Sequence, residues 1–337
     1  MMKVVIINKS DSTGGAAVVS RRLMDALVDV GVDARMLVAQ KLSDSPRVAL
    51  GASKAAIRRE FLQERLGIFM QNGMSRSTLF KIDTGADGVA IWKHPWVQEA
   101  DVVCLNWINQ GFVSLVGVRR LLDMGKPVVW TMHDMWNMTG ICHHSEECAN
   151  WLHHCGGCPL LGDKGGDPDL SVRVWMEKDD LYRRAARRIR FVAVSNWLAR
   201  RAKDSGLLGD QEVTVIPNPF PFDSGEPRFI GGQRGDRFRI LFGAARLDDP
   251  IKGLPILIRA TKALAERHKD IAARCELVTF GGEKNADTLK GFGIAHRHMG
   301  VLDGDAVRDL YRSGDVVVSS SYYELSLIHI SEPTRPY

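Results

Sequence analysis

The chain has 337 residues, enough for two domains, and its 45% hydrophobic and 25% charged residues are typical of a globular protein. A net charge of +5 permits attraction to anionic nucleotides or lipid head groups without demanding a nucleic-acid partner, and we expect none. The first apolar run is too short for a signal peptide, and no stretch approaches the roughly 20 apolar residues of a membrane span. We therefore expect a cytoplasmic protein with reduced thiols.

Apolar strand-like runs alternate with helix-like stretches through the first two thirds of the chain. Strands are expected over residues 3–8, 34–38, 101–106, 127–133, 191–195 and 213–217. Helices are expected over residues 18–30, 57–70, 113–124, 171–188 and 197–203, while the rest of 50–98 has no clear pattern. This alternation predicts a mostly parallel sheet covered on both faces, which binds ligands at the C-terminal ends of its strands.

A stretch rich in Pro, Gly and charge over residues 219–236 indicates a linker. After it the same alternation restarts, with strands expected over residues 238–244, 275–280 and 316–320 and helices over 254–267 and 306–312. The sequence therefore predicts an N-terminal Rossmann-like domain over residues 1–218 and a second α/β domain over residues 237–324.

Residues 325–337 do not continue this pattern. A helix is due after the strand expected at 316–320, but Pro333 and Pro336 disfavour one. The string closely resembles the translation of a transposase-type sequencing adapter read as gene, and the alternative is a genuine variable tail. On the adapter interpretation native sequence stops near Glu324, so the second domain is incomplete and has an exposed sheet edge.

Two cations follow the first strand of the second domain. Arg246 and Lys252 are expected in the loop that begins after residue 244, just before a helix. A helix N-terminus with free N–H groups suits a phosphate, and the two side chains add charge-assisted hydrogen bonds. Such cations can stabilise a diphosphate leaving group. The alternative is that both are solvated loop cations.

In the first domain, His133 ends a strand and is expected to point toward the ligand edge of the sheet. A neutral imidazole near pH 7 can donate or accept a hydrogen bond. Asp134, the next residue, could orient that ring or contact an acceptor. The alternative is that this pair caps a loop.

The segment from Arg246 to Lys252-Gly253 resembles the donor-phosphate signature of the retaining glycosyltransferases of family 4. Further segments similar to that family occur in the expected order at residues 14–16, 194–196, 215–218, 280–282 and 315–324. Each motif is weak alone, but the set covers nearly the whole chain up to Glu324. The resemblance implies a GT-B fold, in which two Rossmann-like domains face a cleft.

The resemblance also implies the chemistry. It implies retaining transfer of a hexose from a UDP- or GDP-sugar to a glycan or lipid-linked acceptor in bacterial cell-surface polysaccharide biosynthesis, with no catalytic cofactor. The catalytic residues that it implies are His133, Arg246, Lys252 and Glu324. The donor-binding residues are Gly14, Gly15, Gly281, Gly282, Arg246 and Lys252. The second glutamate of the Glu-x7-Glu motif does not follow Glu324, as an incomplete domain predicts.

A Cys-rich insertion over residues 142–158 follows the His133-Asp134 pair. It contains Cys142, Cys148, Cys155 and Cys158, interleaved with histidines. Soft thiolates in a reducing compartment, with one C-x2-C knuckle, suit a tetrahedral structural zinc, although disulfides or unligated thiols also fit. A zinc-stabilised binding or scaffold protein without catalysis is therefore the alternative to an enzyme.

The predicted helix at 171–188 continues into a basic segment. Its Arg pairs could meet a membrane surface that carries a lipid-linked acceptor, which would make the protein peripheral to the inner membrane. The upstream acids Glu177, Asp179 and Asp180 favour the simpler interpretation, a solvated helix face.

Overall fold

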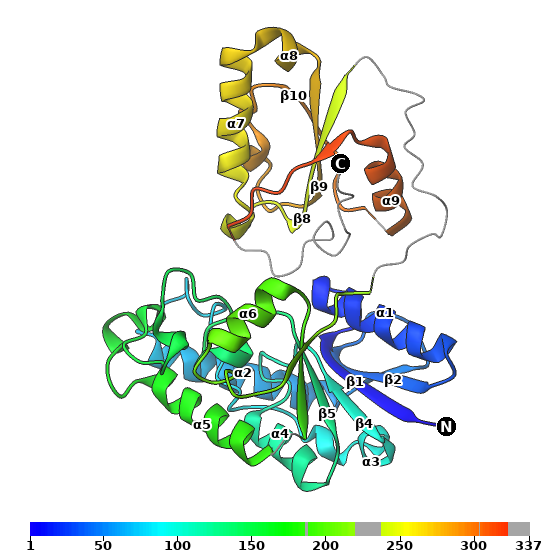
Figure 1. Cartoon of the computed structure of the whole chain (residues 1–337), viewed down its shortest axis with the longest axis vertical. Coiled ribbons are helices and arrows are strands. Elements are labelled where there is room, and N and C mark those ends of the chain that lie inside the picture. Colours follow the sequence, from blue (N-terminus) through cyan, green and yellow to red (C-terminus); the bar gives the residue numbers. More distant parts are fainter. Residues whose placement is uncertain (186–187, 220–236, 303, 323–337) are drawn as a thin grey trace. The chain divides into compact units, whose positions relative to one another are not determined.

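Short runs rich in Val, Ile and Leu build a parallel sheet in the first part of the chain. The computed structural model describes residues 1–185, 188–219, 237–302 and 304–322, of which 1–219 form an N-terminal unit and 237–322 a C-terminal unit. The strands of the N-terminal unit are β1 (Lys3–Ser10), β2 (Asp33–Gln40), β3 (Val48–Leu50), β4 (Val102–Leu105), β5 (Val128–Met132), β6 (Ile189–Ala193) and β7 (Val213–Val215). They pair in parallel in the order β3-β2-β1-β4-β5-β6-β7 (Figure 1).

Helices cover both faces of this sheet because alternate strand residues point to opposite sides. The helices of the N-terminal unit are α1 (Gly15–Asp29), α2 (Lys54–Gln71), α3 (Pro95–Glu99), α4 (Leu115–Asp123), α5 (Leu170–Ala185) and α6 (Asn196–Asp204). Val4 and Ile6 share one apolar cluster with Met24 of α1, whereas Val5 and Ile7 belong to the cluster that includes α2, α4, α5 and α6. Figure 1 shows α1 on one side of the sheet and α4 and α5 on the other.

The C-terminal unit repeats the arrangement on a smaller scale. Its strands β8 (Phe238–Arg246), β9 (Cys275–Gly282), β10 (Ala295–His298) and β11 (Val316–Val317) pair in parallel in the order β10-β9-β8-β11. Its helices are α7 (Leu254–Arg267), α8 (Lys269–Ala273) and α9 (Gly304–Ser313). Phe242 and Leu277 pack with α7 and α8, whereas Leu241 and Val278 pack with Leu310 of α9.

Short stretches of 3-10 helix connect several of these elements. They are η1 (Ile91–Lys93), η2 (Trp136–Met138), η3 (Asn150–Leu152), η4 (Pro159–Lys164), η5 (Pro250–Lys252) and η6 (Ala286–Leu289). Among the described helices, none is long and apolar enough to cross a bilayer.

The expected elements are all present, with shifted ends. The strand expected to end at residue 244 continues to Arg246, and a register shift between Gly243 and Arg246 marks the irregular part. The strand expected over 316–320 is only β11 (Val316–Val317), and β3, β10, α3 and α8 were not expected. Residues 220–236 of the predicted linker, Glu324 and residues 325–337 lie outside the described residues.

Candidate active site

The strand order of the N-terminal unit reverses between β1 and β4, because β2 lies on one side of β1 and β4 on the other. In open parallel sheets, ligands bind outside the carboxyl ends of the strands at such a point. Asp11 follows β1, Asn106 follows β4, and His133 follows the neighbouring strand β5. His133 therefore lies at the edge of the sheet where the sequence predicted it.

The imidazole of His133 is held by Asn106. His133 Nε2 lies 2.9 Å from Asn106 Oδ1. Since a carbonyl oxygen only accepts, Nε2 carries the proton, and Nδ1 is left as an acceptor. Burial lowers the pKa of His133 to about 4, although the charge of Asp134 opposes this. His133 is thus neutral near pH 7, and it presents a defined acceptor atom to a hydroxyl group.

Asn106 also has donor capacity to spare. Its side chain is buried, and its Nδ2 has no hydrogen-bond partner among the described residues. A buried polar group without a partner costs free energy unless something pairs with it. Together, Asn106 Nδ2 as donor and His133 Nδ1 as acceptor can recognise hydroxyl groups, the commonest groups of a sugar.

Asp134 does not orient the ring of His133. Its carboxylate accepts hydrogen bonds from His143 Nδ1 at 2.7 Å, Trp107 Nε1 at 2.7 Å and the backbone N–H of Trp136 at 2.8 Å. Burial alone would raise the pKa of Asp134, but the charge of His143 and these donors outweigh it and lower the pKa to about 2. The hypothesis that Asp134 positions His133 is replaced by a buried pair with His143.

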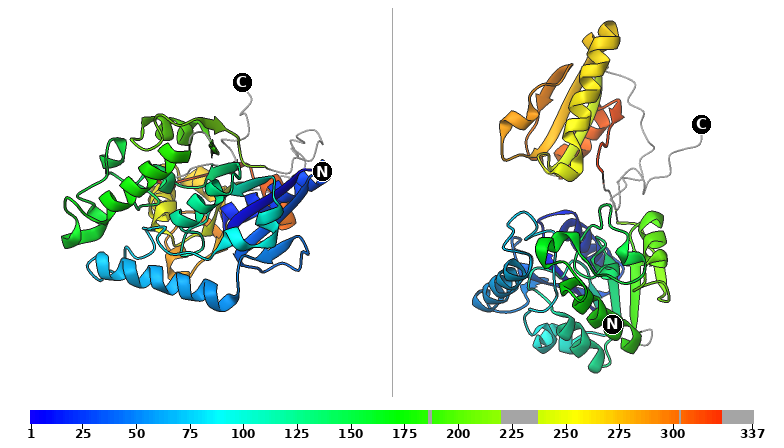
Figure 2. Two further views of the ribbon diagram at one scale, coloured as in Figure 1. Left: turned by 90° about the horizontal axis from the view of Figure 1, so that it is seen from below. Right: turned by 90° about the vertical axis from the view of Figure 1, so that its left-hand side faces the viewer.

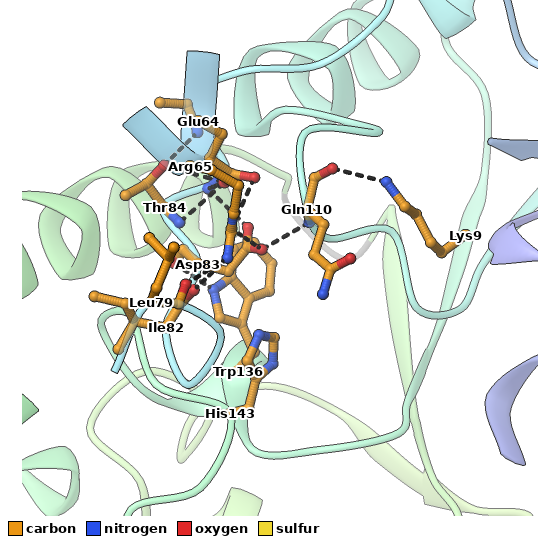
Figure 3. Close-up of polar contacts among 12 residues, drawn as sticks. Lys9, Glu64, Arg65, Leu79, Ile82, Asp83, Thr84, Gln110, Trp136 and His143 are labelled. Carbon is orange, nitrogen blue, oxygen red and sulfur yellow. Dashed lines mark hydrogen bonds and ion pairs between the residues drawn. The ribbon is translucent and has the colours of Figure 1, made fainter. Parts of the chain in front are cut away.

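A buried charge network ties the loops at this edge together (Figure 3). Arg65 Nη2 lies 3.1 Å from Glu64 Oε2 and 3.0 Å from Asp83 Oδ2. Asp83 Oδ2 also accepts the backbone N–H of Gln110 at 2.7 Å, and the carbonyl of Gln110 accepts from Lys9 Nζ at 2.8 Å. The network therefore joins the end of β1, helix α2 and the loop after β4.

The pKa values of the two carboxyls of this network are shifted in opposite directions. Burial, and the nearby charge of Asp83, raise the pKa of Glu64 well above its ordinary value. Burial also opposes the charge of Asp83, but its hydrogen bond with Glu64 and the charges of His143 and Arg65 lower its pKa. Of the two carboxyls, Glu64 therefore holds a proton more readily, and Asp83 is the anion that faces the Arg65 guanidinium.

The loop after β1 contains Gly14 and Gly15, and the space beside these two glycines is open. Gly14 has a φ of 88°, in the region that favours glycine, and Gly15 is the first residue of α1. A Cβ placed on either residue would find no heavy atom within 4 Å. The N-terminus of α1, with its unpaired N–H groups, is therefore accessible to a ligand.

The four cysteines of the insertion line one small cavity of about 20 Å³, together with Trp151, Ser171 and neighbouring residues. All four are free thiols, and the backbone N–H of Gly140 donates to Cys155 Sγ at 3.1 Å. Burial raises the pKa of Cys142 to about 12 and that of Cys158 to about 11. Among the described residues, no three His, Cys, Asp or Glu side chains are arranged as a metal-binding group.

Below the insertion, Lys178 of α5 is fully buried. Its ammonium donates to the carbonyls of Trp136, Thr139 and Gly140 at 2.6, 3.1 and 2.9 Å, and it lies 3.5 Å from the centre of the Trp136 ring. Burial lowers the pKa of Lys178 to about 7. This side chain fixes the turn that leads from the His133-Asp134 pair into the Cys-rich insertion.

In the C-terminal unit, the predicted donor-binding residues Arg246, Gly281 and Gly282 lie at the C-terminal ends of adjacent strands. Arg246 ends β8, and it pairs in register with Gly282, the last residue of β9. Its guanidinium forms a two-pronged ion pair with Asp248, at 3.0 and 3.2 Å, and its side chain is 51% exposed. The sequence placed Arg246 in a loop, whereas it is the last residue of a strand.

Lys252 ends η5 and stands directly before Gly253, the N-cap of α7. Gly253 has a φ of 66°, and a Cβ there would lie 1.9 Å from the carbonyl oxygen of Ser320. Gly281 is equally constrained, because a Cβ would lie 1.7 Å from the carbonyl oxygen of Ala244. Gly281 thus lets β9 approach β8 closely, and Gly253 lets the start of α7 approach the segment after β11. Lys252 therefore stands at the positive end of a helix dipole.

Sequence reasoning missed the role of His143 and the Glu64-Arg65-Asp83 network. His143 was considered only as one of the histidines among the cysteines. The one available signal was that Asp134, Trp136 and His143 lie within ten positions after a strand end. The neighbouring cysteines made a metal site the more obvious interpretation of His143. Glu64 and Arg65 lie in a helix whose other charged residues are mostly exposed, so nothing in the pattern distinguished them.

Comparison with known families matches residues 13–223 to Glycosyltransferase Family 4. WcaC of Escherichia coli strain K12, a glycosyl transferase assigned to colanic acid biosynthesis, is 33% identical over 72 residues, which are 20% of this chain and 17% of that protein. The uncharacterized glycosyltransferase MJ1607 of Methanocaldococcus jannaschii is 33% identical over 103 residues, 29% of this chain and 24% of that protein. The chain thus matches less than a quarter of the length of either relative.

Solved structures resemble a larger part of the chain. Sucrose-phosphate synthase of Thermosynechococcus elongatus has a TM-score of 0.58 at 12% identity, covering 98% of this chain and 78% of that one. WaaG, a glycosyltransferase involved in lipopolysaccharide biosynthesis, has a TM-score of 0.52 at 13% identity, covering 96% and 76%. At such identities the likeness concerns the fold alone, and it confirms the predicted GT-B class.

Proposed function

Because this chain belongs to glycosyltransferase family 4, we propose that it transfers a hexose from a UDP- or GDP-sugar to a glycan or lipid-linked acceptor. The observation that carries the proposal is that Arg246 and Gly282 pair at the ends of adjacent strands and that Lys252, in the following loop, directly precedes the N-cap of α7. The matched relative assigned to colanic acid biosynthesis supports a role in cell-surface polysaccharide assembly. One solved neighbour, an E. coli trehalose-6-phosphate structure with a TM-score of 0.51, is bound with UDP-2-fluoro glucose.

In the proposed reaction the C-terminal unit binds the donor. Arg246 and Lys252 face the diphosphate, and the dipole of α7 adds to their field. As the bond between sugar and diphosphate breaks, negative charge grows on the phosphate oxygen, and fixed cations stabilise it more than they stabilise the intact donor. Gly281 and Gly282, at the end of β9, approach the base and ribose, and Glu324 contacts the sugar hydroxyls. No catalytic cofactor enters this scheme, and the configuration at the anomeric carbon is retained.

The N-terminal unit supplies the acceptor side. His133 Nδ1 accepts from a hydroxyl, and Asn106 Nδ2 donates to one. The open loop at Gly14 and Gly15 stays proposed to bind the donor. Because the pKa of His133 is lowered to about 4, its role at neutral pH is to position and accept rather than to carry a charge.

The test is hydrolysis of UDP-, GDP-, ADP- and dTDP-sugars by the protein and by Arg246→Ala. The matched control is Arg297→Ala, which removes an arginine of similar exposure (48%) that pairs with Glu276 in the same unit. We expect hydrolysis of one donor, retained by the control and reduced roughly 100-fold or more by Arg246→Ala. Full turnover by Arg246→Ala would refute the assignment of Arg246. Before this assay, the gene would be resequenced across codon 324, because the adapter interpretation of residues 325–337 is still a prediction.

We also propose that the four cysteines hold a structural zinc. Their common cavity supports this, and a bound Zn²⁺ would deprotonate thiols whose pKa burial now raises. Metal analysis of the purified protein should give one zinc per chain, lost in Cys155→Ser together with Cys158→Ser. A chain without zinc would refute the proposal. Zinc without any donor binding or hydrolysis would instead favour the alternative, a zinc-stabilised binding or scaffold protein.

If the acceptor is lipid-linked, the protein would work at the cytoplasmic face of the inner membrane. The basic helix α5 does not support this role, because Arg183 and Arg184 are paired with Asp179 and Asp180 one turn earlier. The favoured interpretation of α5 therefore stays a solvated face.

A further inference from the structure

Trp107 lies where the ends of three neighbouring strands of the N-terminal unit meet. It follows β4, its backbone N–H donates to Asn8 Oδ1 at 2.9 Å, and its carbonyl accepts from the backbone N–H of Lys9 at 2.8 Å, both residues of β1. Its indole Nε1 donates to Oδ2 of Asp134, just after β5, at 2.7 Å. These strands run in parallel side by side (Figure 2), so their three ends share the edge of the sheet where ligands bind.

Two contacts fix the orientation of the Trp107 indole. Its N–H is bonded to Asp134, whose carboxylate is itself held by His143 Nδ1 at 2.7 Å and by the backbone N–H of Trp136 at 2.8 Å. The ring of His143 lies against the indole, with the ring centroids 5.6 Å apart and the planes at 34°. An indole that only fills a core can bond to a backbone carbonyl instead, as Trp136 Nε1 does to Asp83 at 2.8 Å. Trp107 is thus held by a buried carboxylate and an imidazole together.

The Trp107 side chain is fixed without being covered. Trp107 is half-buried, whereas Trp130 in β5 and Trp136 in η2 are each 1% exposed and belong to the apolar core. Trp107 directly follows Asn106, whose Nδ2 has no partner among the described residues and whose Oδ1 holds His133. This edge of the sheet therefore offers a fixed aromatic ring together with a donor and an acceptor for hydroxyl groups.

The geometry points to Trp107 as the platform on which the acceptor sugar stacks. One face of a pyranose ring carries mainly C–H hydrogens, which are attracted to the electron-rich face of an aromatic ring, while the hydroxyl groups lie around the edge. Trp107 contacts the C–H face, and Asn106 and His133 bind hydroxyl groups of the same sugar. An aromatic wall with a few fixed polar groups is typical of small-molecule sites. The inference rests on the proposed glycosyl transfer, because it concerns the acceptor side of that same site.

The test is saturation-transfer NMR of the full chain with millimolar methyl glycosides of glucose, galactose, mannose and fucose, and with the corresponding open-chain alditols. Irradiation of the aromatic protons of the protein should transfer saturation to the C–H protons of at least one glycoside. The transfer to its alditol should be much smaller, because an alditol has hydroxyl groups but no rigid ring face. Trp107→Leu should weaken glycoside binding roughly tenfold, the effect of removing a stacked aromatic ring. Trp107→Phe keeps an aromatic face and should retain more binding than Trp107→Leu.

The matched control is Trp96→Leu on α3. Trp96 is also half-buried and also lies beside a histidine ring, that of His94 at 5.4 Å between centroids. Because α3 directly precedes β4, Trp96 lies at the opposite edge of the sheet from Trp107. Trp96→Leu should bind the glycosides as the unchanged protein does, and circular dichroism checks that each variant is folded.

Three results would overturn the inference: no glycoside binding by the unchanged protein, equal binding by Trp107→Leu, or equal losses in Trp107→Leu and Trp107→Phe. A response from UDP or GDP that Trp107→Leu abolishes, without one from any glycoside, would also overturn it, since Trp107 would then stack on a base. Donor hydrolysis by the unchanged protein is measured separately. Its absence, with glycoside binding that depends on Trp107, would refute glycosyl transfer while supporting the sugar platform.

Discussion

Exchange of Glu64 and Asp83 for their amides should have very different effects, although both side chains are 0% exposed beside Arg65. Because burial and Asp83 raise the pKa of Glu64, Glu64→Gln replaces the carboxyl that holds a proton more readily by an uncharged amide of similar size. Its Oε1 accepts from the N–H groups of Thr84 and Gly85 at 3.2 Å each, and a glutamine carbonyl can keep both bonds. Asp83→Asn instead removes the anion that balances Arg65.

The magnitudes follow from this asymmetry. Loss of one partner of a buried ion pair costs about 3–5 kcal/mol, because the remaining charge stays buried. Rearranging one hydrogen bond, as in Glu64→Gln, costs about 1 kcal/mol. The two effects should also respond oppositely to pH. The lowered pKa of Asp83 gives stability that is present above its unfolded pKa of about 3.8 and lost as pH falls through the folded value.

Glu64 follows the opposite rule because its pKa is raised. The unfolded chain loses this proton above about pH 4.5 while the folded chain keeps it, so Glu64 lowers the free energy of unfolding as pH rises. Glu64→Gln removes that penalty, so its stability should improve relative to the unchanged protein as the pH rises above about 5. Asp83→Asn should be most harmful at neutral pH.

Urea unfolding followed by tryptophan fluorescence at pH 5, 6, 7 and 8 measures these differences. Glu99→Gln, which breaks the exposed Lys3–Glu99 ion pair, is the control and should change the free energy of unfolding by less than about 1 kcal/mol. Equal losses for Glu64→Gln and Asp83→Asn, or a larger loss for Glu64→Gln, would refute the protonation states assigned to the network.

Three further predictions concern the site. With His133 at a pKa of about 4, sugar transfer should stay constant from pH 8 to 6 and fall only near pH 4, and His133→Ala should remove that acid limb. In urea unfolding, Gly253→Ala should destabilise the C-terminal unit by more than about 1 kcal/mol, whereas Gly15→Ala, with open space around it, should leave the stability of the N-terminal unit unchanged. Lys178→Met should destabilise by about 2–4 kcal/mol, measured the same way, because three buried carbonyls lose their donor.

The sequence was sufficient to predict the central strands of both sheets, because each of them is an apolar run next to a helical pattern. It failed for β10, which reads Ala-His-Arg-His and lies at the edge of its sheet, where polar residues are tolerated. It also ended β8 too early, since Gly243, Ala244 and Ala245 look like a turn although the strand continues past a register shift to Arg246.

Only part of the candidate site could be predicted from the sequence, because some of its residues are recognised only by their contacts in the folded chain. His133, Arg246 and Gly281 stand next to strand ends, so their position in the pattern reveals them. Asn106 also follows a strand, but an asparagine there is common in loops, and only its contact with His133 gives it a role. The roles of Glu64 and His143 depend on neighbours 19 and 9 positions away, which no local pattern encodes.

The pairing of Asp134 with His143 makes the Cys-rich insertion inseparable from the strand end that precedes it. Asp134 lies just after β5, and His143 belongs to the insertion next to Cys142. Removing the insertion as if it were a dispensable surface loop would take His143 away from the buried carboxylate of Asp134. The indole of Trp107 would then be its main remaining side-chain donor. An engineer who wished to shorten this protein would therefore have to redesign Asp134 and Trp107 together with the cysteines.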